Sequence, residues 1–456
     1  YDPEAAGEAR FCAMAAAWDL GDATAYLAAL GTPPAPGAAD RGGADADAQA
    51  EEYRAAMSVV MRGRVGAASR GLRRVVDHGE GADEPERLLR AGVAALVLGD
   101  LAAASRVNAR ALAAARSRGT DIHVPQALEY LAYAELRAGR HARARAHAEE
   151  GLRAAEAAGQ CNVAAQHHAI LALVASVEGV DDEVTARAAA AARIAGRHGL
   201  TQASTLAQWA LARLDLSRGR VPEAAARLGP VVRPGPRRGH FAVRMLAVPC
   251  YVEAAVLAGE GERARRCVAE FAEWAAQRAD PQAPALLARC HALLADPGEG
   301  DALYAAALAR HELAGGDFEH ARTQLLYGKW LRRRRRPGEA RGRLLDALVS
   351  FERCGARAWA EQTLAELRAT GGAGAAAGQR AAEPRGRLSN LTPQQLRIAR
   401  CVAEGATNRE VARRLSVSPR TVDHHLRNVF ALLGVRSRVE LSRLVARCEE
   451  LSAAGD

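Results

Sequence analysis

The sequence predicts an all-α protein in which an array of helical repeats is followed by a small domain of four helices. Glycines recur every 20 residues from Gly99 to Gly259, and residues 388–447 contain four sets of helix start and stop signals. Aromatic residues make up only 4% of the chain. Cores must therefore be built from Ala, Leu and Val, which suits close-packed helices, and no convincing strand pattern occurs.

Taken in order, residues 1–30 are predicted to form one Ala-rich helix, and Gly, Pro and Asp mark a loop from residue 32 to 48. The chain starts at Tyr1 without Met, and we expect this to be an internal point of a longer protein. Helix follows helix from about 49 to 369. Beyond residue 280 the expected helices cover 281–295, 301–314, 317–335, 338–353 and 357–369.

A period of 40 residues runs through the first part of this region. Each glycine is predicted to end one helix of a pair and to turn the chain. Small or apolar residues recur five positions after the first set, at Ala104, Ala144, Val184, Ala224 and Ala264. The pattern resembles a tetratricopeptide-like array, whose units stack into a superhelix. The two sets of glycines are Gly99, Gly139, Gly179, Gly219 and Gly259, and Gly119, Gly159, Gly199 and Gly239.

Composition divides the chain into three parts. Residues 1–370 are the helical-repeat region, residues 371–387 are rich in Gly and Ala and form a flexible linker, and residues 388–450 are the C-terminal domain. The last part is strongly basic. Residues 388–447 hold 11 Arg and 4 acidic residues, whereas the whole chain carries a net charge of only +9. A basic surface of this kind is typical of phosphate binding.

Four helices are predicted in the C-terminal domain, at 393–404, 408–415, 419–433 and 438–446. Pro393 and Pro419 occupy first helical positions, Gly405 and Gly434 follow helix ends, and Ser437 with Glu440 forms a capping box. Thr407 or Asn408 is predicted to cap the second helix, and Ser418 the third. A helix, a short turn and a second helix form the arrangement that places the second helix in a DNA major groove.

The apolar stripe of the third helix predicts which of its faces is free. Val422, Leu426, Val429, Phe430 and Leu433 are expected to be buried. The opposite face carries Arg420, Asp423, His424, Arg427 and Asn428, which are donors and acceptors of the kind that read base edges. His425 is expected to pack or to reach a phosphate.

These residues also resemble a known family. The stretch LTPQQLRIARCVAEGATNREVARRLSVSPRTVDHHLRNVFALLGVRSRVEL is similar to the LuxR-type helix-turn-helix along its whole length. Asp423 stands where the family often has Lys, which implies a different base preference. Together with the repeats, the chain resembles the C-terminal part of the large ATP-binding regulators of the LuxR family. The absent ATPase leaves a partial chain or a natural short form as alternatives.

The resemblance implies a transcriptional regulator, commonly an activator, that binds double-stranded DNA as a homodimer and contacts RNA polymerase. A protein or small-molecule effector would bind to the helical repeats. The fourth helix carries four apolar residues that either supply part of the dimer contact or only close the domain core, namely Val439, Leu441, Leu444 and Val445. The expected DNA-binding residues are Thr407, Asn408, Arg409, Ser418, Arg420, Thr421, Asp423, His424, Arg427, Asn428 and Arg438.

An alternative function is a helical-repeat scaffold whose helix-turn-helix docks protein instead of DNA. No catalytic set, cofactor site or metal site is predicted, and we expect no enzymatic activity. The only Lys, Lys329, is followed by Trp330, so no P-loop sequence exists. His167 and His168 are adjacent and face different directions, which disfavours a metal site.

Four further features of the sequence bear on its function and surroundings. The arginines from Arg332 to Arg336 form a solvated helix end or a nucleic-acid patch. Tyr304, Trp330 and Trp359 line an effector pocket or pack in the core. The 8 Cys are expected to be buried reduced thiols of a cytoplasmic protein. No apolar run approaches the ~18 residues of a membrane span, so no contact with a membrane is expected.

Overall fold

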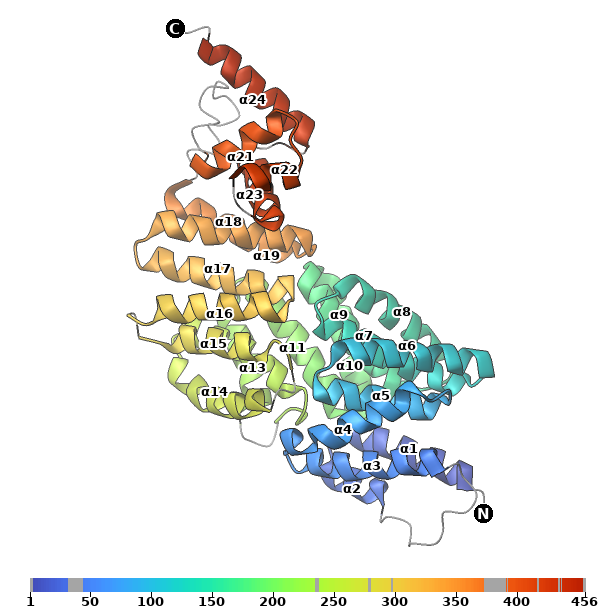
Figure 1. Cartoon of the computed structure of the whole chain (residues 1–456). Helices are drawn as coiled ribbons and strands as arrows, with labels where there is room; N and C mark the ends of the chain where they lie inside the picture. The colour runs from blue at the N-terminus through green and yellow to red at the C-terminus, as the bar shows by residue number, and fades with distance from the viewer. Residues whose placement is uncertain are drawn as a thin grey trace. The chain divides into compact units, whose positions relative to one another are not determined.

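The structure is a computed structural model that describes residues 3–31, 44–233, 238–277, 280–296, 298–372, 391, 393–415, 418–433, 435 and 437–453. Every regular element in these ranges is helical, and no strand occurs among them, which confirms the all-α prediction (Figure 1). None of the described helices combines the length and apolar character that crossing a bilayer requires. The predicted linker lies largely outside the described residues.

Packing divides the chain into two units. Unit 1 comprises Tyr1–Thr323 and Cys354–Gln362, and unit 2 comprises Gln324–Arg353 and Thr363–Asp456. Helices α17 and α19 each contribute residues to both units. The predicted domain boundary near residue 370 stays a prediction.

Unit 1 is a succession of helices joined mostly by short turns, each packed against the next. Its elements are α1 (Pro3–Leu20), α2 (Ala23–Leu30), α3 (Ala44–Met61), α4 (Val65–Glu80), α5 (Pro85–Leu98), α6 (Leu101–Arg118), η1 (Asp121–His123), α7 (Val124–Arg137), α8 (His141–Ala157), α9 (Cys161–Glu178), α10 (Asp181–His198), α11 (Thr201–Ser217), α12 (Val221–Val232), α13 (Arg244–Leu257), α14 (Gly261–Ala276), α15 (Ala283–Leu294), α16 (Gly300–Ala314) and the start of α17 (Asp317–Arg333).

Unit 2 contains the end of α17 and the C-terminal helices. Its other elements are α18 (Pro337–Arg353), the end of α19 (Arg357–Leu367), the π-helical turn η2 (Arg368–Gly372), α21 (Pro393–Ala403), α22 (Asn408–Leu415), α23 (Pro419–Leu433) and α24 (Arg438–Ala453).

The prediction of a single helix over residues 1–30 is wrong. Gly21 adopts a left-handed backbone at φ 72°, which ends α1. The side chain of Asp22 then accepts a hydrogen bond of 2.9 Å from the backbone N–H of Ala25 and caps α2. The two helices pack against each other, and Tyr26 and Leu30 are buried. Packing and capping thus break a stretch whose composition alone favours continuous helix.

The periodic glycines mostly act as predicted. Gly99 has φ 73° and ends α5 in a Schellman arrangement, in which Asp100 N–H donates to Ala95 O at 3.0 Å. Left-handed φ values recur at Gly119, Gly139, Gly159, Gly179, Gly199, Gly219 and Gly259. Ala104, Ala144, Val184, Ala224 and Ala264 are each fully buried, as their place in the period predicts. The membership of these helix pairs in the tetratricopeptide class stays a prediction.

Gly239 is the exception, and its predicted role as a helix end is wrong. It lies in the segment before α13 and does not have a left-handed φ. A Cβ atom at this position would come within 2.6 Å of Val231 Cγ1 and 2.8 Å of Thr205 Oγ1. The absence of a side chain, and not a turn, is therefore what this position requires.

Two further glycines allow neighbouring helices to approach closely within unit 1. A Cβ on Gly92 in α5 would lie 2.1 Å from Asn108 Oδ1 in α6. A Cβ on Gly151 in α8 would lie 2.1 Å from His167 Cε1 in α9. His167 is fully buried, and its Nε2 lies 3.1 Å from the carbonyl oxygen of Pro125. The imidazole is thus held by this contact in a fully buried position and cannot easily move away.

We expect Gly151→Ala to lower the free energy of unfolding of unit 1 by about 1–3 kcal/mol, because the new methyl group overpacks the contact with His167. Gly196→Ala in α10 is the matched control. No atom lies within 4 Å of its added Cβ, so the same change should stabilise the helix by about 0.5–1 kcal/mol. Urea unfolding of both variants measures the difference. Equal effects of the two substitutions would contradict the close-approach argument.

Several side chains that were candidates for ligand or metal binding pack in the core instead. His167 is a core residue, and its burial lowers its pKa to about 4. Tyr304 and Trp359 are completely buried and pack in the interior of unit 1. The prediction of buried cysteines holds for Cys250, Cys267 and Cys290 but is wrong for two others, because Cys12 and Cys161 are exposed.

The arginine run from Arg332 to Arg336 in unit 2 lies at a helix end, which agrees with the prediction of a solvated helix end. Arg332 Nε donates to Glu366 Oε2 at 2.9 Å, and Arg336 Nε donates to Glu339 Oε1 at 2.6 Å. Arg335 has φ 57° and closes α17 in the left-handed conformation that Gly takes elsewhere in the chain. These contacts with acids of the same unit favour a solvated helix terminus over a nucleic-acid patch.

Candidate nucleic-acid interface

Helices α21 to α24 pack around one small hydrophobic core. Their start points agree with the four predicted helices, and only the last differs clearly in length, because α24 continues to Ala453 instead of ending near 446. The core contains one or more apolar side chains from every helix, and the buried members are Leu391, Ile398, Ala399, Val402, Ala406, Val411, Ala412, Val422, Leu426, Val429, Leu433, Leu441 and Val445.

Side-chain caps fix the starts of the two central helices. Thr407, and not Asn408, caps α22. Its backbone N–H donates to Glu410 Oε2 at 2.7 Å, while its hydroxyl accepts from the Glu410 N–H at 3.4 Å. The Thr407 backbone N–H and hydroxyl lower the pKa of the Glu410 carboxyl. Ser418 Oγ accepts from the Thr421 N–H at 3.0 Å and so caps α23.

The buried face of α23 is the predicted one. Val422 and Val429 are fully buried, Leu426 and Leu433 nearly so, and Phe430 is partly buried. This places the polar residues of the helix on the side away from the core. His424 and Arg427 are exposed, and Asp423 and Asn428 are partly exposed. The side chain of Arg420 lies outside the described residues.

Pairs four residues apart organise this exposed face. Arg427 Nη2 donates to Asp423 Oδ2, and both side chains remain about half exposed, at 44% and 48%. Asn428 Nδ2 lies 3.4 Å from His424 Nε2. Burial and the neighbouring His424 lower the pKa of His425, which is partly buried beside this face. The Asp423 carboxylate thus holds the Arg427 guanidinium on the free side of the helix.

The residues expected to bind phosphates fall into two groups. Thr407, Arg409 and Ser418 are exposed at helix starts, where free amides and the helix dipole favour anions. Arg438 instead turns inward. Its Nη1 donates to Asn408 Oδ1 at 2.7 Å, and its Nη2 donates to the carbonyl oxygen of Ala406. Arg438 and Asn408 therefore join the start of α24 to the start of α22.

Five exposed arginines among the described residues of the domain lie outside the predicted set. They are Arg397 and Arg400 on α21, Arg413 and Arg414 on α22 and Arg443 on α24. The sequence indicates their part in a basic surface only through the excess of Arg over acidic residues in this domain. The phase and packing of each helix determine which of these arginines face the same side as α23.

The comparisons identify this domain. Residues 389–445 match the family described as bacterial regulatory proteins, luxR family. The C-terminal domain is a luxR-type helix-turn-helix. A protein of Mycobacterium tuberculosis strain H37Rv named as an HTH-type transcriptional regulator is 45% identical over 92 residues, which are 20% of this chain and 10% of that relative.

Two shorter matches fall in the same class. The HTH-type transcriptional regulator AlkS of Alcanivorax borkumensis is 41% identical over 51 residues, which are 11% of this chain and 6% of that protein. The monoamine regulon transcriptional regulator of Klebsiella aerogenes is 47% identical over 51 residues, 11% of this chain and 22% of that protein. The chain thus matches only a small share of these relatives' length. The domain is of the type found in DNA-binding transcriptional regulators.

Proposed function

We propose that this chain is a sequence-specific DNA-binding transcriptional regulator whose helix α23 reads the major groove. The observation that carries the proposal is the division of α23 into two faces. One face is locked into the domain core, and the other presents Asp423, His424, Arg427 and Asn428 to the exterior. Acceptors and donors on one free helix face, within a basic domain, are what base readout requires.

Phosphate contacts by Thr407, Arg409, Ser418, Arg420 and Thr421 belong to the same proposal. The inward bonds of Arg438 and Asn408 favour a positioning role for these two, in which they hold α22 and α24 together. To contact DNA, the Arg438 guanidinium would have to reach a phosphate while it keeps its hydrogen bond to Ala406 O, or it would have to break that bond.

The proposal extends to the regulatory mechanism. The helical repeats receive a protein or small-molecule effector, and the DNA-bound form is a homodimer that activates transcription by contact with RNA polymerase in the cytoplasm. Resemblance to the large ATP-binding regulators of the LuxR family supports these points. The Mycobacterium tuberculosis relative, of which the matched 92 residues are only 10%, is also a much longer protein.

Dimerisation through α24 is the part of the proposal most constrained by the packing. Leu441 and Val445 are buried in the domain core, and Leu444 packs against it while remaining partly exposed. The side chain of Val439 lies outside the described residues. Leu444 is therefore the residue left for a partner contact. Leu444→Arg should reduce the preference for DNA with two half-sites over DNA with one, and an unchanged preference in a folded variant would remove α24 from the dimer contact.

Salt dependence tests DNA binding directly. Arg409→Ala in the full chain should weaken binding by similar factors on all DNA sequences and should lower the slope of log K against log salt by ~1. Fluorescence anisotropy across a series of salt concentrations measures this slope. Binding sites are first obtained by selecting DNA from a random pool with the native chain. If the chain selects no sequence and binds DNA without salt dependence, the scaffold alternative is the better description.

A further inference from the structure

A cavity of about 970 Å³ lies within unit 1. Helices α1, α2, α3, α7 and α11 and the segment before α13 all contribute residues to its wall. This volume is in the range of sites that enclose small organic molecules. The proposed DNA contacts in α21 to α24 make no use of this cavity.

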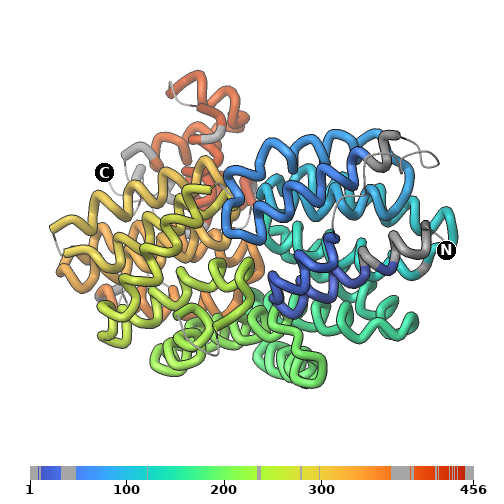
Figure 2. The backbone as a smooth tube through the Cα atoms, turned by 90° about the horizontal axis from the view of Figure 1, so that it is seen from below, coloured from blue at the N-terminus to red at the C-terminus, as the bar shows by residue number. Residues whose placement is uncertain are grey.

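The cavity exists because α1 lies across helices that are far away in the sequence (Figure 2). Gln166 Nε2 in α9 donates to Asp19 Oδ1 in α1 at 3.0 Å. His240 Nε2 lies 2.7 Å from the carbonyl oxygen of Trp18. The Trp18 and Phe241 rings are 5.1 Å apart in an edge-to-face arrangement. These contacts hold the last turn of α1 against unit 1 and fix two of its side chains at the cavity wall.

Aromatic rings form much of this wall, although aromatic residues make up only 4% of the chain. The Trp18 and Tyr26 rings are 6.0 Å apart, and Tyr26 Oη is 3.3 Å from Tyr53 Oη. The aromatic residues that line the cavity near α1 and α7 are Trp18, Tyr26, Tyr53, Tyr130, Tyr133 and Phe241. Ring faces of this kind attract organic cations.

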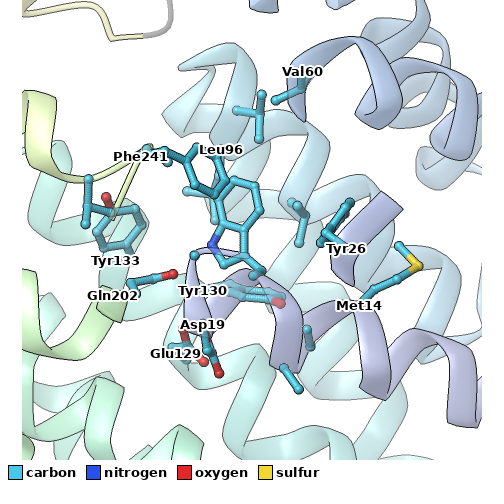
Figure 3. A pocket seen from close by; sticks show the side chains of 18 of the residues that line it. Met14, Asp19, Tyr26, Val60, Leu96, Glu129, Tyr130, Tyr133, Gln202 and Phe241 are labelled. Atoms are coloured by element: carbon cyan, nitrogen blue, oxygen red, sulfur yellow. The ribbon is translucent and has the colours of Figure 1, made fainter. Parts of the chain in front are cut away.

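Two carboxyl groups also line the cavity and lie close to each other (Figure 3). Among the described residues, one side chain, that of Gln166, donates a hydrogen bond to the Asp19 carboxyl group. Glu129 in α7 is only 8% exposed, and no described residue donates a hydrogen bond to it or forms an ion pair with it. A buried carboxylate without a partner is costly, so the site lacks a positive charge.

The cations of the protein that line the same cavity do not supply this charge. Arg137 binds Asp280 at 2.9 Å, Arg244 binds Glu270, and His123 Nε2 lies 2.7 Å from Glu86 Oε1. Each is thus matched by its own acid. His198 also lines the cavity, but its side chain is exposed to solvent. Asp19 and Glu129 remain as the buried acids of the wall that no described cation pairs with.

The titration of the pair follows from this environment. Burial raises the pKa of Asp19 to about 7, against the opposing effect of the Gln166 hydrogen bond. Burial, and then the charge of Asp19, raises the pKa of Glu129 well above its ordinary value. Burial and the Glu129 carboxylate also raise the pKa of Tyr130 next to the pair. A positive charge placed between the carboxyl groups would favour the ionised forms of both.

We propose that this cavity binds an organic ammonium ion with an apolar or aromatic body, whose positive charge lies between Asp19 and Glu129 and whose body contacts the rings of Trp18, Tyr26 and Tyr130. The proposal does not depend on DNA binding by the C-terminal domain. It assigns a chemical class to the ligand of the helical repeats.

The test uses the native full chain and a set of arylalkylammonium ions with two to six methylene groups, together with the neutral alcohols of the same lengths. Isothermal titration calorimetry gives the dissociation constants. At least one ammonium ion should bind tenfold or more tightly than its matched alcohol, because only the cation can pair with the carboxyl groups. If every ammonium ion binds no better than its alcohol, or no probe binds at all, the proposal is wrong.

Asp19→Asn and Glu129→Gln should each weaken binding of the ammonium ion tenfold or more and leave the alcohol unaffected. Glu312→Gln, which removes an exposed carboxylate of α16, is the control and should change neither probe. Glu129→Gln also removes an unpaired buried acid, so we expect the ligand-free variant to unfold at a temperature no lower than that of the native chain. Ammonium binding that is unchanged in both cavity variants would place the ligand elsewhere and overturn the proposal.

Discussion

Replacing Glu319 by alanine should lower the free energy of unfolding of unit 1 by about 3–5 kcal/mol, the largest effect that we expect from any single charge in the chain. The side chain of Glu319 is 13% exposed and lies among three arginines on different helices. Arg213 Nη2 in α11 donates to it at 2.6 Å, Arg289 Nη1 in α15 at 2.8 Å, and Arg322 Nη1 in α17 at 3.2 Å.

The size of the effect follows from what the arginines would lose. Burial would raise the pKa of Glu319, but the charges of Arg322, Arg289 and Arg213 outweigh it and hold the pKa well below its ordinary value. Arg322 would keep Glu253 as a partner. Arg213 and Arg289 contact no other carboxylate among the described residues, and their side chains are only 6% and 1% exposed. Alanine would therefore leave two buried guanidinium groups without a counter-charge.

Glu361→Ala is the matched control, because Glu361 also pairs with an arginine, Arg218, at 3.0 Å, but its side chain is 67% exposed. This change should cost less than about 1 kcal/mol. Urea unfolding with hydrogen exchange at α11 and α15 reports the stability of unit 1. A loss for Glu319→Ala as small as that for Glu361→Ala would show that Arg213 and Arg289 can be satisfied by water or by other groups.

Arg427→Ala should weaken binding to the preferred DNA site by about 1–3 kcal/mol, and much less when the base pair that Arg427 contacts is changed. The guanidinium fork matches the O6 and N7 atoms of guanine, and Asp423 holds that fork on the free face of α23. A contact that only reached phosphate would weaken both DNAs alike. Anisotropy titrations of both sites distinguish the two contacts.

Two further variants sharpen this test. Arg413→Ala removes an exposed charge from α22. Because it lies outside α23, it should affect both DNA sites by the same factor. Asp423→Lys breaks the pair with Arg427 and places a donor where an acceptor stood, so selection from a random pool should return a different preferred base. Recovery of the original site with this variant would show that Asp423 carries no sequence information and forms only a surface ion pair.

Local sequence signals were sufficient for the C-terminal domain. Proline at the first helical position, a capping side chain and an apolar stripe act within one or two turns, so the start of each helix and the buried face of α23 could be predicted. The same locality explains the periodic glycines, because a left-handed helix end depends on one residue. Local signals do not distinguish Thr407 from Asn408 as the capping residue of α22, and the structure selects Thr407.

One wrong prediction concerns a local signal, because the left-handed Gly21 and the Asp22 cap separate α1 from α2. Other features depend on segments that are distant in the chain, and the role of Gly239 depends on Val231 and Thr205. The bonds that Arg438 makes within the domain could not be predicted from its position at a helix start, and its contact with phosphate stays a prediction. Its partners, Asn408 and Ala406, are about 30 residues earlier in the chain, and no spacing rule within one helix connects them.

The sequence by itself determined the all-α class, the positions of the C-terminal helices and the residues that α23 exposes, because all of these follow from hydrophobic period and capping within a helix. Only the tertiary structure decided the cavity and the buried charges of unit 1. Asp19 meets Gln166 and Glu319 meets Arg213 across more than a hundred residues of chain, and such contacts are set by how successive helices stack. The packing of α1 against α9 and α11 is what places two carboxyl groups in an aromatic cavity.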